Sequence, residues 1–152
     1  MATSELVLGS SGGGRTPIKI ASVTTNLNDN IVDVLTALKT NAGSKLAQAL
    51  NENWNTLYLR TYVYNTTLNT YVIHLFKLST TVIPTNTTGN AIFTEVYMNT
   101  AGDRSVVQNI IIDLTSSNNH KFTTSTITAS GTTISSATTV GTSFVGEWEL
   151  YV

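Results

Sequence analysis

The feature that most constrains this chain is a change in the spacing of its apolar residues. From Leu57 onward, apolar and polar side chains alternate with a period of two, which places successive side chains on opposite faces of an extended strand. β-Branched and aromatic residues dominate the alternating segments, and polar turns separate them. The segments are 57–65, 70–79, 91–98, 105–115, 121–129, 132–136 and 142–152. About seven or eight short strands at this spacing predict a mainly β domain, of the β-sandwich or jelly-roll-like kind.

Two pairs of neighbouring segments are separated by loops of hairpin length. Residues 66–69 separate the first pair, and residues 99–104, which contain Gly and Asp as turn formers, separate the second. We therefore expect two antiparallel hairpins. Residues 106–112 are nearly continuously apolar, which is typical of a strand at the centre of a sheet.

Residues 27–57 show the only spacing that is typical of helices. Apolar residues recur there at steps of three and four, which gives each of two helices one apolar stripe. The stripes are formed by Leu27, Ile31, Val34 and Leu38, and by Leu46, Leu50, Asn53 and Leu57. Asp29 or Asn30 is expected to cap the first helix. Gly43 is suited to end it, and Ser44 to cap the second helix.

The two stripes have two interpretations. The helices pack on the β-domain, or they form a short seam that joins identical chains. Each run spans only about two heptads, which is too short for an independent coiled coil. Val32, Leu35 and Trp54 broaden the apolar faces, which favours packing against a sheet.

A glycine-rich run at residues 9–14 separates a short apolar segment, Leu6–Leu8, from the rest of the chain. Such a run is too flexible to order by itself. It is either a flexible linker or the spacer of an arm whose first eight residues pair with another protein. The expected organisation is an N-terminal arm at 1–22, a helical segment at 23–56 and a β-domain at 57–152. With no signal peptide and no long apolar run, we expect a soluble protein that is not exported by the usual signal.

The composition describes a neutral, hydroxyl-rich surface. Only 11% of the 152 residues are charged and the formal net charge is -1, whereas Thr, Asn and Ser are abundant. The chain therefore lacks the basic surface that nucleic acid requires. It has no cysteine, so disulfides and thiolate metal sites are excluded. We expect no cofactor and no membrane insertion.

Residues 122–146 consist mostly of Thr, Ser, Gly and Ala. Apolar residues are sparse there, namely Ile127, Ile134, Val140 and Phe144. A monomeric edge strand of this composition gains little from burial. The segment is therefore either a solvated hairpin, with Thr selected for its β-propensity, or a surface where small hydroxylated residues let several chains pack around an axis.

No pattern in the sequence indicates a metal site. His74 and His120 are the two histidines, and neither belongs to a metal-binding motif, so each is expected to be a strand or turn residue. Residues 26–33 contain three Asn and two Asp, as a calcium loop does, but Ile31 occupies the position where such a loop needs glycine. We interpret this segment as a helix cap.

Glu147 and Glu149 alternate with Trp148 on the last expected strand, so their carboxylates face the same way, about 7 Å apart. This spacing is compatible with a glycosidase pair, but two acids on a terminal strand are expected to be solvated. Alternation also places Phe144, Trp148, Leu150 and Val152 on one face, which we expect to be buried. We assign no catalytic residue.

The aromatic residues suggest a second kind of site. Candidate sugar-stacking rings are Trp54, Trp148, Tyr58, Tyr62, Tyr64, Tyr71, Tyr97 and Tyr151. Their positions on expected strands are equally typical of core packing. A row formed by Thr124, Thr126 and Thr128 resembles the ladders of ice-binding proteins, but it occurs only once.

Several features together resemble bacteriophage virion appendage proteins, such as head fibres, tail fibres and capsid decorations. They are the glycine spacer, the short helical segment, the Thr/Ser/Asn-rich β-domain, the stretch Ser130–Thr142 and the terminal Gly146–Val152. The resemblance implies a homotrimer whose N-terminal part docks on other virion proteins. It also implies a C-terminal β-domain that faces outward, often toward host surface glycans.

We therefore expect a non-enzymatic virion structural protein. The alternative is a glycan- or receptor-binding module for host attachment. A third interpretation is a small hydrolase that uses Glu147 and Glu149.

Overall fold

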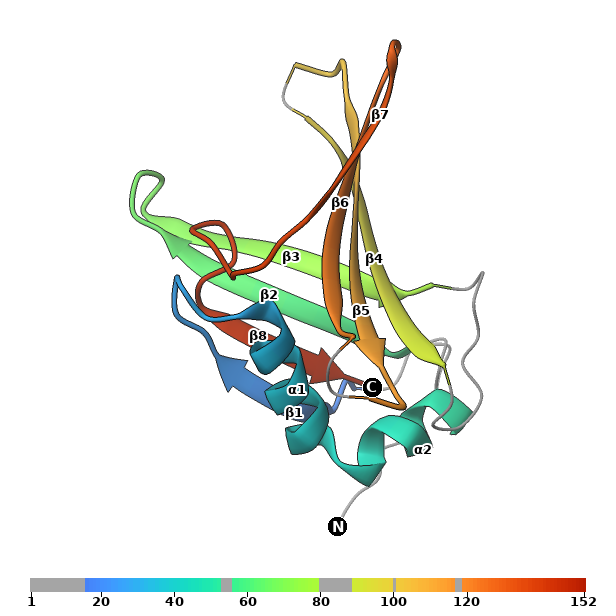
Figure 1. Cartoon of the computed structure of the whole chain (residues 1–152). Coiled ribbons are helices and arrows are strands. Elements are labelled where there is room, and N and C mark those ends of the chain that lie inside the picture. The colour runs from blue at the N-terminus through green and yellow to red at the C-terminus, as the bar shows by residue number, and fades with distance from the viewer. Residues whose placement is uncertain (1–15, 53–55, 80–88, 100, 117–118) are drawn as a thin grey trace.

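The computed structural model describes residues 16–52, 56–79, 89–99, 101–116 and 119–152. Within these residues the protein is mainly β, with eight strands and two short helices (Figure 1). The elements are β1 (Lys19–Thr24), α1 (Ile31–Ala42), α2 (Ser44–Glu52), β2 (Tyr58–Asn65), β3 (Thr70–Leu78), β4 (Asn90–Met98), β5 (Ser105–Asp113), β6 (Lys121–Thr128), β7 (Gly131–Ser136) and β8 (Glu147–Tyr151). The predicted mainly β class is confirmed, and each segment expected to be a strand after residue 57 contains one.

All eight strands belong to one antiparallel sheet with the order β1-β8-β2-β3-β4-β5-β6-β7. The hairpins predicted around residues 66–69 and 99–104 are the pairs β2–β3 and β4–β5. β5, which contains the continuous apolar run, lies between β4 and β6. On β5 the side chains of one face, such as Ile110 and Ile112, are buried, whereas Ile111 on the other face is half-buried.

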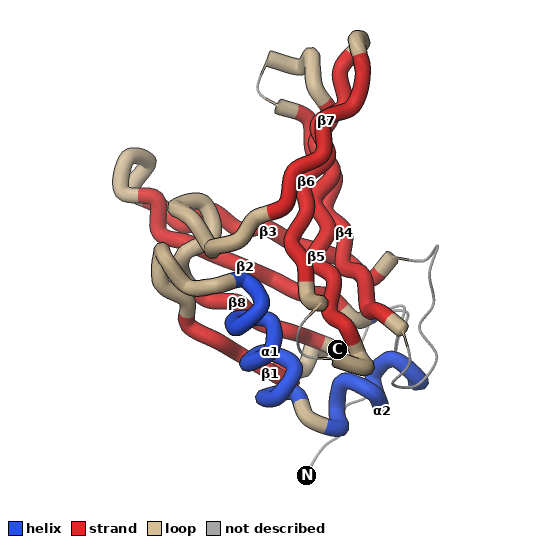
Figure 2. The backbone as a smooth tube through the Cα atoms, in the orientation of Figure 1, coloured by secondary structure: helices blue, strands red, loops and turns tan. Residues whose placement is uncertain are grey.

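The sheet divides into two halves at the junction between β3 and β4. These strands pair only at Lys77↔Thr94 and Leu78↔Phe93, whereas β4 and β5 pair along their whole length. Beyond the junction the two halves diverge, and the ends of β4 to β7 project away from the β2–β3 hairpin (Figures 1 and 2). The sheet therefore has a concave inner face and an outer face.

α1 packs on the inner face, against β1 and β8, and α2 packs against α1. The Asn30 side chain accepts hydrogen bonds from the backbone N–H groups of Val32 and Asp33, and Gly43, at φ +55°, follows the last residue of α1. These are the capping roles that the sequence predicts for Asn30 and Gly43. The buried stripe of α1 is formed by Ile31, Val34, Leu35, Leu38 and Ala42. Because this stripe is covered within the chain, the structure favours packing against the sheet; Asn53 and Trp54 lie outside the described residues.

The core fills the concavity between the two halves of the sheet. Trp148 and Leu150 of β8 are fully buried, as the sequence predicts for this face of the last strand. Residues 137–146 return across the inner face and carry Phe144 into an aromatic cluster, where its ring centroid lies 4.8 Å from that of Phe122 and 6.4 Å from that of Trp148. The indole N–H of Trp148 donates to the Phe144 carbonyl at 2.8 Å. The cluster joins both halves of the sheet to the returning segment.

β1 is a strand that the sequence interpretation missed. It begins inside the range expected for the arm, 1–22, and ends inside the expected helical segment. β1 pairs with β8 and forms one edge of the sheet, but a bulge between Lys19 and Ala21 breaks its period of two. This irregularity explains why alternation does not reveal it. The glycine-rich run at 9–14 lies outside the described residues.

The expected last strand, 142–152, is shorter in the structure. β8 begins at Glu147 because Gly146, at φ +154°, interrupts the extended backbone. A Cβ atom at Gly146 would clash with the carbonyl oxygen of Tyr62. Only glycine permits this close approach between the returning segment and β2.

Candidate functional site

The outer face of β8, β2 and β3 gathers five of the six tyrosines. They are Tyr58, Tyr62, Tyr64, Tyr71 and Tyr151, and the strand register places all of them on one face. The rings contact one another: Tyr58 and Tyr151 stack with centroids 5.1 Å apart, and Tyr71 meets Tyr62 and Tyr64 edge to face. The helices pack on the opposite face, so these rings are not part of the core.

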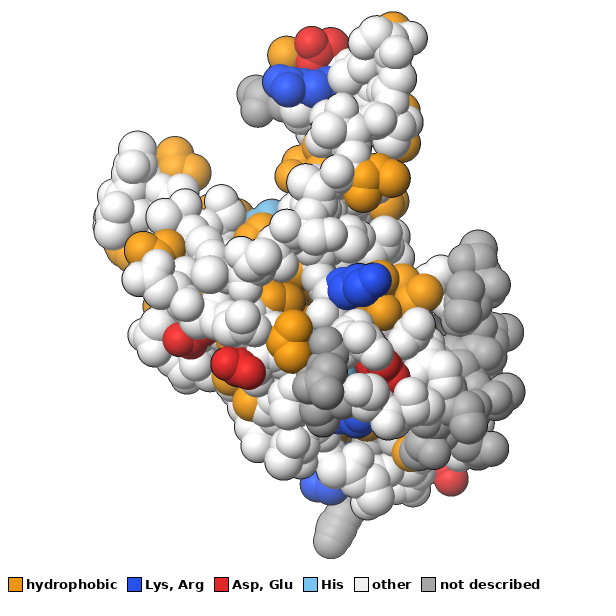
Figure 3. Space-filling model, viewed as in Figure 1, with side chains coloured by type: hydrophobic (Ala, Val, Ile, Leu, Met, Phe, Trp, Pro, Cys, Tyr) orange, Lys and Arg blue, Asp and Glu red, His pale blue; other side chains and the backbone are white. Residues whose placement is uncertain are grey.

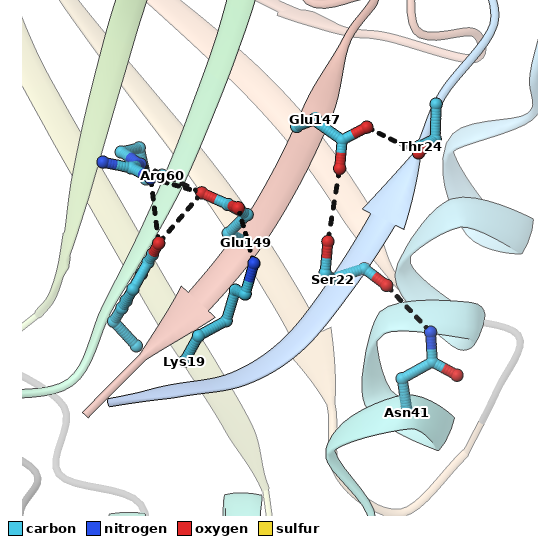
Figure 4. Close-up of polar contacts among 8 residues, drawn as sticks. Lys19, Ser22, Thr24, Asn41, Arg60, Glu147 and Glu149 are labelled. Atoms are coloured by element: carbon cyan, nitrogen blue, oxygen red, sulfur yellow. Dashed lines mark hydrogen bonds and ion pairs between the residues drawn. The ribbon is translucent and has the colours of Figure 1, made fainter. Parts of the chain in front are cut away.

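A buried carboxylate organises this tyrosine face (Figure 4). The Glu149 side chain is only 4% exposed, and its Oε1 accepts hydrogen bonds from Arg60 Nη2 at 2.6 Å and from Tyr151 at 3.1 Å. Lys19 Nζ donates to Oε2 at 3.2 Å. Burial by itself raises the pKa of Glu149, but the hydrogen bonds from Arg60, Lys19 and Tyr151 outweigh it and hold the pKa below its usual value. The Arg60 guanidinium also lies over the Tyr151 ring, 5.0 Å from its centroid.

The expectation that both terminal glutamates are solvated is therefore wrong for Glu149. Glu147 lies on the same face, where it accepts hydrogen bonds from the hydroxyls of Ser22 and Thr24. A glycosidase acid needs a raised pKa, whereas two cations hold Glu149 in its charged form. This arrangement gives no support to the hydrolase interpretation.

Apolar side chains continue across the outer face onto the second half of the sheet. Lys77 of β3 lies on the same face as the tyrosines and pairs with Thr94 of β4. Because paired residues point to the same side of a sheet, Thr94 marks the outer side of β4. The large exposed hydrophobic residues on this face are Tyr64, Tyr71, Ile73, Leu75, Val96, Met98, Ile127 and Ile134. Val96 and Ile134 are the most exposed of them, at 66% and 69%. Exposed apolar surface of this extent is unusual for a monomer and is typical of an interaction surface.

A cleft opens on the inner side, between the β2–β3 tip and the projecting strands. Figure 3 shows the corresponding hollow between the two lobes. The cleft has a volume of about 430 Å³. It is lined by Val63, Tyr64, Asn65, Thr66, Thr67, Val72, His74, Tyr97, Gln108, Thr142, Ser143 and Phe144. None of these side chains is a lysine, arginine, aspartate or glutamate.

An imidazole–carboxylate pair lies beside the cleft. His74 Nδ1 of β3 is 2.8 Å from Glu95 Oε1 of β4, and both side chains are mostly buried. The His74 ring also packs against Phe144, with centroids 4.5 Å apart. The pair therefore holds β3 and β4 together where their backbones no longer pair.

Gln108 is the most unusual residue of the cleft. It is 6% exposed, and its Nε2 group donates to Thr124 at 3.3 Å. Its carbonyl oxygen, Oε1, is buried and has no hydrogen-bond partner in the described part of the chain. Because nearly all buried polar atoms in proteins have a partner, this oxygen marks a position where a donor is missing.

The other residues considered from the sequence have structural roles. His120 is buried, and its Nδ1 accepts the backbone N–H of Asp113 at 2.9 Å, as expected for a turn residue. Burial, and then the nearby charge of Lys39, lower the pKa of His120. Trp148 lies in the core and is not available for stacking, whereas Trp54 lies outside the described residues. In the part that the structure describes, no cluster of His, Asp or Glu has the arrangement of a metal site.

The remaining sequence candidates separate between the two sides of the sheet. Tyr97 lies on the inner side of the sheet and lines the cleft, which Tyr64 of the outer-face group also borders at the β2–β3 tip. Thr124 and Thr126, from the row compared with ice-binding ladders, lie on the same side of the sheet as Tyr97. The Thr124 hydroxyl accepts a hydrogen bond from Gln108, so it is not part of a free row of hydroxyls. Sequence reasoning did not identify Gln108 or the pair of His74 and Glu95. The signal for Gln108 was a polar residue in phase with the buried residues of its strand.

Comparisons with protein-family models, with curated proteins and with solved structures find no match. Among the described residues, no helix combines the length and the apolar character needed to cross a membrane. The outer face and the cleft are therefore the features from which function is inferred.

Proposed function

We propose that this chain is a non-enzymatic virion structural protein, of the head-fibre, capsid-decoration or tail-associated kind, which assembles as a homotrimer. The observation that supports assembly most directly is the open outer face of the sheet. Val96, Met98 and Ile134 stand on it with more than half of their surface exposed. Packing against another protein would remove this apolar surface from water, at about 25 cal/mol per Å².

A second copy of the chain is the partner that the surface chemistry favours. Opposite charges normally steer different proteins together, but only 11% of these residues are charged. β7 also forms an edge of the sheet, and all six of its residues are exposed. Its sequence, Gly131–Ser136, contains no charge and no proline that would prevent contact with another chain.

The sandwich that the sequence predicts belongs to the same proposal. Sheets that face each other normally pack about 10 Å apart, with apolar side chains between them. The outer faces of neighbouring copies supply such side chains. In a trimer the outer faces of the three copies would meet around the threefold axis, so each sheet would be covered by its neighbours and not by a second layer of its own chain.

Light scattering coupled to size-exclusion chromatography tests the assembly. A homotrimer has three times the chain mass of 16.3 kDa, which is about 49 kDa. The double variant Val96→Asn, Ile134→Asn should run as a monomer. Leu68→Asn is the matched control, because Leu68 is equally exposed but lies in the β2–β3 turn. A monomeric parent protein at tens of micromolar, or a trimer that survives the double variant, contradicts the proposal.

The attachment of the arm to other virion proteins is a separate part of the proposal. Deleting residues 1–14 should leave the melting temperature nearly unchanged, while binding to the particle should fall sharply. If the deletion unfolds the protein, residues 6–8 belong to the core and the tether interpretation is wrong.

A further inference from the structure

We infer that the cleft between the two halves of the sheet binds a neutral pyranose sugar. All of the lining residues come from one chain, so this site goes beyond the proposed assembly and does not depend on it. Its volume, about 430 Å³, lies within the usual range for small-molecule sites. It is concave, whereas the tyrosines of the outer face are occupied with one another.

The Gln108 side-chain oxygen in the cleft has no hydrogen-bond partner among the described residues. This oxygen accepts hydrogen bonds only, so the missing partner must be a donor. A sugar hydroxyl is such a donor, and the same hydroxyl has lone pairs that can accept from a neighbouring group. Asn65, Thr142 and Ser143 line the same cleft and offer amide and hydroxyl groups for a polyhydroxylated ligand.

Part of the cleft lining is aromatic. Phe144 is held in place by Phe122 and His74, and Tyr97 stands on β4 with 42% of its surface exposed. The C–H face of a pyranose ring is apolar and can cover such a ring, while its hydroxyls point toward the polar residues. A ligand with one apolar face and a polar rim therefore matches a cleft that is aromatic on one part of its lining and polar on the other.

The charge of the lining selects among sugars. The cleft has no lysine or arginine in its lining, and its one imidazole, His74, is already paired with a carboxylate, so it offers no free cation to a phosphate, a sulfate or a carboxylate. Glu95, just behind the lining, is paired with His74. The cleft therefore favours an uncharged sugar over an acidic one.

Titration of the ¹⁵N-labelled full-length protein with methyl α-glucopyranoside, methyl β-galactopyranoside and methyl α-mannopyranoside tests this inference. At least one of them should shift the side-chain amide signals of Gln108 and the backbone signals of residues 142–144. Weak sugar binding, with a Kd of about 1 mM, is sufficient for this measurement. N-Acetylneuraminic acid should bind at least about tenfold more weakly, a difference of about 1.4 kcal/mol.

Gln108→Met separates binding from folding. This change removes the unpartnered buried oxygen at nearly constant size, so the melting temperature should stay the same or rise. The affinity for the sugar should fall about tenfold or more. Gln48→Met, the same change on the exposed side of α2, is the control and should leave both quantities unchanged. Tyr97→Ala is a second variant that should weaken binding, because it removes one ring of the cleft.

Three results would overturn the inference. The first is the absence of any shift with all three glycosides at about 50 mM, far above the millimolar range of weak complexes. The second is a set of shifts confined to Tyr58, Tyr62 and Tyr151, which would place the sugar on the outer face. The third is unchanged affinity in both Gln108→Met and Tyr97→Ala.

Discussion

His74 Nδ1 lies 2.8 Å from Glu95 Oε1, across a part of the sheet where β3 and β4 have no backbone pairing. The two strands pair only at Lys77↔Thr94 and Leu78↔Phe93. A side-chain contact therefore connects the two strands here, whereas backbone hydrogen bonds connect neighbouring strands elsewhere in the sheet. It also fixes the separation of the two walls of the cleft.

Replacing Glu95 by Ala should loosen this connection. The change removes a partly buried hydrogen bond to an ionisable partner, and we expect it to lower the free energy of unfolding by about 1–3 kcal/mol. Urea denaturation measures this loss. The control is Asp103→Ala, because Asp103 forms an exposed ion pair with Arg104 at the β4–β5 turn, and its removal should leave the midpoint nearly unchanged. Equal losses in the two variants would show that the His74 contact adds no stability.

The two glutamates of β8 should respond differently to the same substitution. Glu149→Gln weakens the hydrogen bonds from Arg60 and Lys19 to a buried group, which we expect to cost about 2 kcal/mol. Glu147→Gln retains an acceptor for Ser22 and Thr24 and should cost less than about 0.5 kcal/mol. Thermal melts of the two single variants measure the difference. Equal melting temperatures would mean that the network around Glu149 is not formed in solution.

Gly146→Ala should destabilise the protein for a reason that is specific to its position. The new Cβ atom would meet the Tyr62 carbonyl oxygen, and the backbone at φ +154° is unfavourable for alanine. Overpacking and backbone strain together should cost about 2–5 kcal/mol. Gly131→Ala is the matched control, because Gly131 has a similar φ of +147° but open space around it. Chemical denaturation that finds equal losses would assign the whole effect to backbone strain.

The buried His120 should make stability depend on pH. Its pKa is lower in the folded protein than the ordinary value of 6.5, so the unfolded chain takes up a proton first as the pH falls. Stability from this group is complete above about pH 6.5, decreases as the pH falls below that value and stops decreasing below the folded pKa. Urea midpoints between pH 8 and pH 5 measure the slope. His120→Gln should flatten it in this window; the carboxylate of Glu149, whose pKa is lowered, contributes its loss at more acidic pH.

Short runs of apolar, β-branched and aromatic residues between polar segments were sufficient to predict β2 to β7. The pattern failed for β1, where a bulge breaks the period, and for residues 142–146, where Gly146 interrupts the strand. A local pattern also cannot reveal that β3 and β4 separate. That separation depends on packing between residues that are far apart in the chain, such as Phe122 and Phe144.

The candidate sites were predictable only in part. The tyrosines could be identified as a group, but their gathering on one face follows from the register of β2 with β3 and β8. Glu149 was expected to be solvated because its partners, Lys19 and Arg60, lie on strands that are far from β8 in the sequence and next to it in the sheet. Gln108 had a visible signal, a polar residue among buried ones, but nothing in the sequence shows that its oxygen lacks a partner.

Trp148 should be the side chain whose removal costs the most stability. It is fully buried, its ring packs against Phe122 at a centroid distance of 6.0 Å, and its N–H bonds to the Phe144 carbonyl. Trp148→Ala leaves a cavity where both halves of the sheet meet the returning segment, and it should cost about 3–5 kcal/mol. That loss is most of the stability of a typical domain, so circular dichroism should show a largely unfolded protein or a greatly lowered melting temperature. Trp148→Phe keeps a ring and loses the hydrogen bond. Its melting temperature should therefore lie between those of Trp148→Ala and the parent. An alanine variant as stable as the parent would mean that this face of β8 does not carry the core.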